Sequence, residues 1–189
     1  MVRKIEYDFL TWTSFPSSIK LLNDEPTGFV GLRILWDYPV KGGETVKVEA
    51  MVKGENLSDS HMYIRWWDGR NWRDAGVEWL PKGTFDWRKF TMTRTIGTPA
   101  RLLRISIAGG RGLAGKLGIT WVDDVKVWIN GELIYANDFS CWNPYIGAGI
   151  GALATAVPAY LATRKPEYSL LGILGAAAGG LIGWLTAKP

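Results

Sequence analysis

Apolar and polar residues alternate along most of the chain between Val2 and Phe139, and turn residues interrupt the alternation about every eight to fifteen positions. In the segment 45–52 the pattern places one set of side chains in a core: Val46, Val48, Ala50 and Val52. Similar alternation predicts strands over 28–38, 61–67, 87–95, 100–108, 119–129 and 132–136. No helical period interrupts them, so the pattern predicts an all-β sandwich of about eight or nine strands.

The C-terminal part of the chain has a different pattern. After Asp138 the next charged residue is Arg164, and a second uncharged run extends from Tyr168 to Ala187. Each run has the ~20 residues that a helix needs to cross ~30 Å of hydrocarbon. We therefore expect a β-sandwich over residues 1–140 and a transmembrane helical hairpin over 141–189, with helices at about 144–163 and 168–187. Two buried helices of a soluble oligomer are the alternative.

Glycines in both runs stand at intervals that place small residues on one side of a helix, where they let two backbones approach closely. We expect helix packing, within the hairpin or in a homo-oligomer, through Gly147, Gly151, Gly172, Gly175, Gly179 and Gly183. The expected partner is a lipid bilayer, in a cell envelope or a virion membrane. The sequence leaves two alternatives for the side of the membrane on which the β-sandwich lies. Arg164 and Lys165 favour a cytoplasmic connection and hence a sandwich outside, whereas the N-terminus has no apolar signal-peptide core for its export.

Composition narrows the choice of partners. The net charge is +4, and lysines and arginines are scattered singly among acidic residues. A nucleic-acid-binding surface needs a basic stripe, so we expect no nucleic-acid partner. The chain has eleven tryptophans, more than a core of this size requires, and a single cysteine, Cys141, which excludes an internal disulfide.

Two segments carry a resemblance to a known group. Gly83 to Phe90 is similar to a "gt-x-x-W-x-x-f" strand with Trp87 as its tryptophan, and Gly118 to Val125 is similar to "G-x-x-W-x-D-D-V". The chain thus resembles jelly-roll carbohydrate-binding modules with the galactose-binding-like fold over about 130 residues, a scaffold that hosts many roles. The resemblance implies a jelly-roll sandwich, with Trp87 and Trp121 in or near its core.

The late strand contains two adjacent acidic residues, Asp123 and Asp124. Neighbouring strand residues face opposite sides, so both cannot point into the core. In the family that the chain resembles, this aspartate position often helps to hold a structural calcium, and oxygen ligands suit that ion. Asp123 and Asp124 are therefore candidate calcium ligands, and a hydrogen-bonded carboxylate without metal is the alternative.

Catalytic chemistry has little support. His61 is the sole histidine, and we expect it at the surface; Cys141 has no visible base. The carboxylates that a glycoside hydrolase would need fall in turns or exposed alternations: Glu49, Asp68, Asp74 and Glu78. We therefore expect a non-enzyme with no cofactor other than the structural calcium.

The segment 61–79 predicts a ligand site. Alternation places Met62, Ile64 and Trp66 on one face, toward the core, and the turn at 68–71 brings the chain back to Trp72. The opposite face combines aromatic rings with a guanidinium, which suits a sugar ring and its hydroxyls. The candidate glycan-binding residues are Tyr63, Arg65, Trp67 and Trp72; burial of the tryptophans in a neighbouring subunit is the alternative.

Three functions are compatible with these patterns. The first is a membrane-anchored, non-catalytic sandwich that binds carbohydrate or surface partners for adhesion or host recognition. The second is a viral or envelope structural protein whose hairpin embeds in lipid and whose sandwich forms a coat without binding sugar. A membrane-tethered glycan hydrolase ranks well below both.

Overall fold

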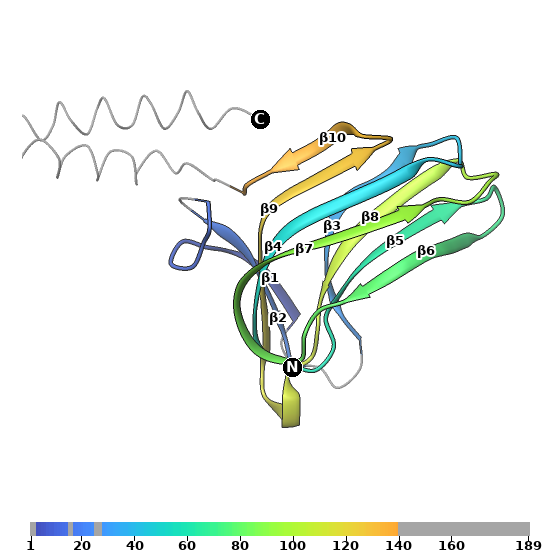
Figure 1. Cartoon of the computed structure of the whole chain (residues 1–189). Coiled ribbons are helices and arrows are strands. Elements are labelled where there is room, and N and C mark those ends of the chain that lie inside the picture. The colour runs from blue at the N-terminus through green and yellow to red at the C-terminus, as the bar shows by residue number, and fades with distance from the viewer. Residues whose placement is uncertain (1–2, 15–16, 25–27, 140–189) are drawn as a thin grey trace, which may run out of the picture. The chain divides into compact units, whose positions relative to one another are not determined.

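Two antiparallel sheets stack face to face in the computed structural model of the protein, which describes residues 3–14, 17–24 and 28–139 (Figure 1). These residues form ten strands and one short 3-10 helix, Leu113–Gly115. The all-β sandwich expected from the alternation is confirmed, with slightly more strands than expected because the N-terminal segment contributes two.

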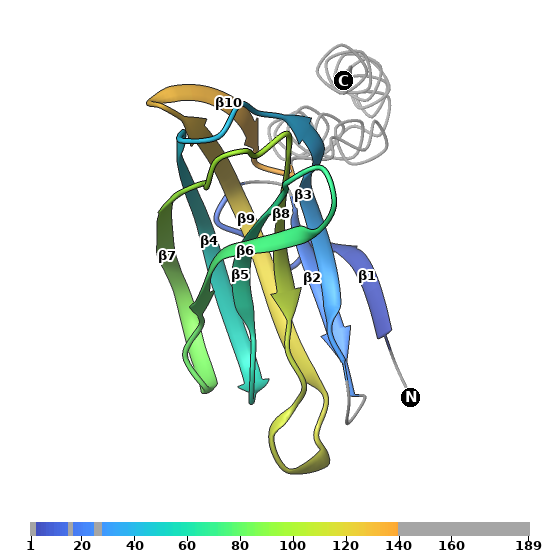
Figure 2. The same ribbon diagram turned by 90° about the vertical axis from the view of Figure 1, so that its right-hand side faces the viewer.

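The larger sheet has six strands in the order β1-β2-β9-β4-β7, with β10 pairing to the second half of β9. The long strand β9 therefore contacts three other strands, β2, β4 and β10, and occupies the middle of the sheet (Figure 2). The bounds are β1 Arg3–Asp8, β2 Ser18–Asn23, β4 Thr45–Leu57, β7 Gly83–Thr95, β9 Gly118–Ile129 and β10 Glu132–Asn137.

The smaller sheet has four strands in the order β3-β8-β5-β6. Its central pair, β8 and β5, is in continuous register from His61 opposite Ala108 to Trp67 opposite Leu102. The bounds are β3 Val30–Pro39, β5 His61–Trp67, β6 Trp72–Trp79 and β8 Leu102–Gly109.

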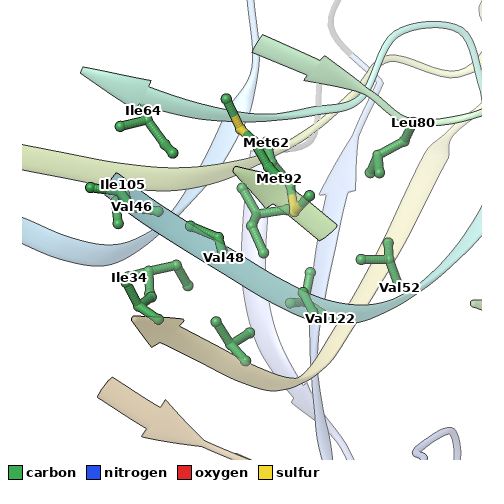
Figure 3. Close-up of a cluster of buried hydrophobic side chains, with 14 of the residues drawn as sticks. Ile34, Val46, Val48, Val52, Met62, Ile64, Leu80, Met92, Ile105 and Val122 are labelled. Atoms are coloured by element: carbon green, nitrogen blue, oxygen red, sulfur yellow. The ribbon is translucent and has the colours of Figure 1, made fainter. Parts of the chain in front are cut away.

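The core lies between the sheets and is filled by the side chains that alternation assigned to it (Figure 3). Val46, Val48 and Val52 of β4 are fully buried, as are Met62 and Ile64 of β5. Because each strand is only half-buried by the other sheet, the intervening side chains of β5 and β8 lie on the outer face of the smaller sheet.

The tryptophans of the two family-like segments take different places. Trp87 is half-buried and lies outside the core cluster, whereas Trp121 is 6% exposed. Its neighbour Val122 belongs to the core, so Trp121 points to the outer face of the larger sheet, where its indole nitrogen donates a 2.7 Å hydrogen bond to Asp8. Trp121 therefore links the end of β1 to β9 across the intervening β2 on that face.

A β-bulge at Asp124, which has φ 44°, changes the alternation in β9. Val122 and Val125 both point into the core, and Asp123 is buried on the opposite side of the strand. Asp123 Oδ2 accepts hydrogen bonds from the backbone nitrogen and hydroxyl of Thr13 and from the nitrogen of Ser14, at 2.8, 2.9 and 2.7 Å. The carboxylate thereby fixes residues 13 and 14 across the outer face of the larger sheet.

The predicted hairpin, with its six packing glycines, lies outside the described residues. Within the segments that the structure describes, none of the helices has the length and apolar character required to cross a bilayer.

Candidate functional site

A groove of about 500 Å³ lies on the outer face of the smaller sheet. All four strands of that sheet contribute to its lining, together with Phe29, which precedes β3. The side chains that β5 and β8 contribute are those that alternate with their core residues, so the pattern that builds the core also determines this part of the groove surface.

The floor of the groove is made of small residues. Gly31 of β3 lies opposite Ala108 of β8, and Ser106 lies one pleat further along the same strand. Ser106 is 1% exposed and Ala108 is 2% exposed. Larger side chains surround these three positions, so the small residues leave open the space that the groove occupies.

Three buried polar atoms in the lining have no hydrogen-bond partner within the described part of the chain. They are His61 Nδ1, Arg65 Nε and Ser106 Oγ, and no other buried side-chain nitrogen or oxygen of the described residues is in this state. An unpaired buried polar group costs about 1–3 kcal/mol, so native proteins rarely leave one without a protein, solvent or ligand partner. Arg65 Nε has Asp74 Oδ1 2.8 Å away, so His61 Nδ1 and Ser106 Oγ are the two atoms that make the groove a candidate site for a polar ligand.

His61 is buried at one end of the groove, which corrects the expectation of a surface residue. It is 9% exposed, and its ring lies 4.7 Å from that of Phe29 and 4.9 Å from that of Trp79, between centroids. Burial lowers the pKa of His61 below its ordinary value of 6.5, and the carboxylate of Asp59 partly offsets this. His61 is therefore neutral at pH 7 and can accept a hydrogen bond.

The free energy of unfolding should depend on pH through His61, the single histidine of the chain. Because its pKa is lowered in the folded state, the unfolded state binds more protons as pH falls through 6.5. Stability should be constant above about pH 7.5 and decrease from there toward about pH 5.5. Urea denaturation of the full-length protein measures this slope, and His61→Gln should remove it. Equal slopes in both proteins would contradict the burial of His61.

Arg65 and Asp74 face each other across β5 and β6. Arg65 Nε lies 2.8 Å from Asp74 Oδ1, but this nitrogen makes no hydrogen bond, so the contact is an ion pair without directional donation. The pair is half-exposed and therefore adds little to stability. Asp74 is the one carboxylate among the described residues that line the groove.

At the other end of the groove, the lining residue Trp36 belongs to a stack of aromatic and guanidinium groups. Arg104 of β8 lies 4.0 Å from the ring centroid of Trp36 and 3.8 Å from that of Trp72. Its Nε and Nη2 donate to the two carboxylate oxygens of Asp37 at 2.7 and 3.2 Å, which lowers the pKa of Asp37. A cation held between two rings fixes both of them in place.

The structure places the four predicted ligand residues on one face, as the alternation requires, but not all in the groove. Tyr63 and Arg65 line it. Trp67 and Trp72 pack together, 5.5 Å between ring centroids, and lie beyond Arg104 at its end. The assignment of all four to ligand binding stays a prediction.

Several lining residues were not found from the sequence. Ser106 and Ala108 were detectable, because they alternate with Leu103, Ile105 and Ile107 in the same strand. Trp36 was not detectable, because two register shifts in β3 place it on the same face of the sheet as Arg33.

Both carboxylate oxygens of Asp123 accept hydrogen bonds from the protein, and these bonds compete with calcium coordination. Besides the bonds from Thr13 and Ser14, Oδ1 accepts from the nitrogen of Asp124, whose own carboxylate pairs with Lys126 at 2.8 Å. In the described part of the chain no group of three or more histidines, cysteines or carboxylates is arranged to hold a metal ion. This donor set suits the metal-free alternative; calcium binding stays a prediction, tested by thermal unfolding with calcium and with EDTA.

Comparison with known proteins shows the fold. No protein-family model and no curated protein sequence matches the chain. Among solved structures, a protein described as "Family 16 Carbohydrate Binding Module-2" is similar with a TM-score of 0.51 and 8% identity, over 67% of this chain and 86% of that one. A CBM4 structure is similar with a TM-score of 0.48 and 15% sequence identity, over 67% of this chain and 90% of that one. The CBM22-1 xylan-binding domain from Paenibacillus barcinonensis is similar with a TM-score of 0.44 and 13% sequence identity, over 67% of this chain and 80% of that one.

The described residues therefore form a β-sandwich of the kind found in a carbohydrate-binding module. The low sequence identity limits this conclusion to the fold, since one scaffold supports many functions.

Proposed function

We propose that the protein is a non-catalytic glycan-binding protein and that the groove on the outer face of the smaller sheet is its binding site. The observation that carries the proposal is that this one groove holds two buried polar atoms without a hydrogen-bond partner, His61 Nδ1 and Ser106 Oγ, beside the ion-paired Arg65. Sugar hydroxyls both donate and accept, so one sugar ring can pair with both atoms. The structural neighbours that are carbohydrate-binding modules support the same reading.

Aromatic residues beside the floor support a sugar ligand over a smaller polar molecule. Tyr63, on the central strand β5, lies opposite Ser106, and its ring is 5.6 Å from that of His61. Flat rings beside unpaired hydrogen-bonding atoms match the apolar faces and polar edges of a pyranose. The stack at Trp72 and Trp67 would extend the surface for a longer oligosaccharide.

The arrangement of carboxylates supports binding without hydrolysis. Glycosidases use two carboxyl groups at ~5–10 Å, one on each side of the bond that is cleaved. Among the described lining residues Asp74 is the one carboxylate, and it is paired with Arg65. We therefore assign Asp74 to orienting Arg65.

The C-terminal segment is proposed to anchor this domain to a membrane. The support is the two long uncharged runs of the sequence and their glycine spacing. A structural role in a coat is the second candidate, favoured by the exposed apolar side chains of the N-terminal segment, of which Leu10 is 90% exposed and Tyr7 is 50% exposed.

The test is binding of the full-length protein to a glycan array, followed by calorimetry with the best ligand. Tyr63→Ala should weaken binding by about 1–2 kcal/mol, because it removes an aromatic contact from the ligand. Tyr7→Ala is the matched control, since Tyr7 is an exposed tyrosine on the other sheet. Trp72→Ala in the same assay should weaken long ligands more than short ones.

The outcomes separate the two candidates. Equal losses in Tyr63→Ala and Tyr7→Ala would exclude the groove as the site. If the wild-type protein binds no glycan on the array, glycan binding is excluded and the coat role gains support.

A further inference from the structure

We propose that the groove selects glycans that carry an acidic group, a carboxylate or a sulfate, and that Arg33 binds this group. The inference rests on the proposed function and specifies its ligand class.

The charges of the groove do not balance. Arg65 is compensated by Asp74 at 2.8 Å, and Arg104, at the edge, is compensated by Asp37 at 2.7 Å. Arg33 lines the groove as well, and among the described residues no carboxylate lies within ion-pairing distance of it. The groove therefore has one uncompensated positive charge.

Arg33 is positioned to act together with an unpaired atom of the floor. Its guanidinium carbon lies 4.1 Å from the ring centroid of Trp36, which orients the planar group. In the register of β3 and β8, Arg33 lies directly opposite Ser106, and Ser106 lies opposite Tyr63. Side chains directly opposite each other in a sheet have Cβ atoms about 4.5–5.5 Å apart. A ligand over the floor can thus contact Arg33 and Ser106 at the same time.

Two hydrogen-bond donors lie side by side at this position. Arg33 offers several N–H groups, and Ser106 offers a hydroxyl that no described side chain or backbone group engages. Asp74 is the one carboxylate among the described lining residues, and it already faces Arg65. A carboxylate or sulfate accepts hydrogen bonds and carries the compensating charge, so it fits this donor set better than a hydroxyl does.

The experiment uses the full-length protein and an array of paired glycans. Each pair contains an acidic glycan, either galacturonate-containing, glucuronate-containing, sialylated or sulfated, and the same glycan without its charged group. We expect the acidic member of at least one pair to bind about tenfold or more tightly, since a charge-assisted hydrogen bond is about twice as strong as a neutral one. Calorimetry on that pair then measures the ratio of the two affinities.

Variants of Arg33 test the assignment. Arg33→Gln should bring the ratio of acidic to neutral affinity close to one, and Arg33→Lys should keep part of it because the charge remains while the planar donor group is lost. Arg88→Gln is the control, because Arg88 is an exposed arginine on β7 of the other sheet. A second measurement needs no variant: raising salt from about 50 to 500 mM should weaken acidic ligands and leave neutral ligands nearly unaffected.

The outcomes are distinguishable. Equal or stronger binding of the neutral members, or an affinity ratio that Arg33→Gln leaves intact, overturns the acidic selectivity while glycan binding stands. Absence of binding to both members of every pair overturns the proposed function, and this inference with it.

Discussion

Replacing Asp123 with alanine is expected to lower the free energy of unfolding by about 3 kcal/mol or more, because it leaves several donors without an acceptor. Asp123 is completely buried, and its carboxylate accepts four hydrogen bonds, from Thr13, Ser14 and Asp124. Hydrogen bonds to a charged group are worth about 1.5–3 kcal/mol each, and water can rescue only part of the loss. Urea denaturation of full-length wild type and variant gives the difference.

A neighbouring substitution is the control for this experiment. Asp124→Asn removes a charge one position away, and asparagine tolerates the positive φ of that residue. The ion pair of Asp124 with Lys126 is partly exposed, so its loss should cost less than about 1 kcal/mol. If Asp123→Ala costs no more than Asp124→Asn, the contacts with residues 13 and 14 do not stabilise the fold.

A tryptophan at Gly31 is expected to abolish ligand binding, with a loss of about 100-fold or more, equal to about 2.7 kcal/mol. Gly31 lies on the floor, and a Cβ added there would meet no atom within 4 Å. The new side chain therefore extends into the groove without displacing the core, and stability should change by no more than about 0.5 kcal/mol. Calorimetry with the array ligand measures binding, and urea denaturation measures stability.

Two further variants make the result specific. Gly31→Ala adds one methyl group at the same place and should reduce affinity by a smaller factor. Leu133→Trp adds an exposed tryptophan on β10 of the other sheet and should leave affinity unchanged. Full affinity in Gly31→Trp would show that the ligand binds elsewhere.

Strict alternation predicts those parts of the fold where strands are regular. In the stretches 46–52 and 62–64 every second side chain faces the core. Neither stretch contains a bulge, so two-residue periodicity determines the direction of each side chain. The same reasoning correctly placed Tyr63 and Arg65 on the outer face.

The remaining site residues depend on features that local periodicity does not contain. Trp36 is two positions from Ile34, so alternation would place both in the core; the register shifts in β3 put Trp36 in the groove. His61 was expected at the surface because its burial comes from Phe29 and Trp79, which are distant in sequence or on another strand. Pairing of β3 with β8, which brings Arg33 next to Ser106, depends on topology and cannot be derived from either strand alone.

The two sets of side chains on β8 have separate roles, and this has an evolutionary consequence. Leu103, Ile105 and Ile107 fill the core, while Ser106 and the small Ala108 line the groove and Arg104 stacks on Trp36 at its edge. Substitutions at the second set alter the shape and charge of the groove but leave interior packing untouched, so drift toward a new ligand need not pass through unstable intermediates. Ligand recognition by this domain can therefore change in evolution through substitutions at alternate residues of β8 alone.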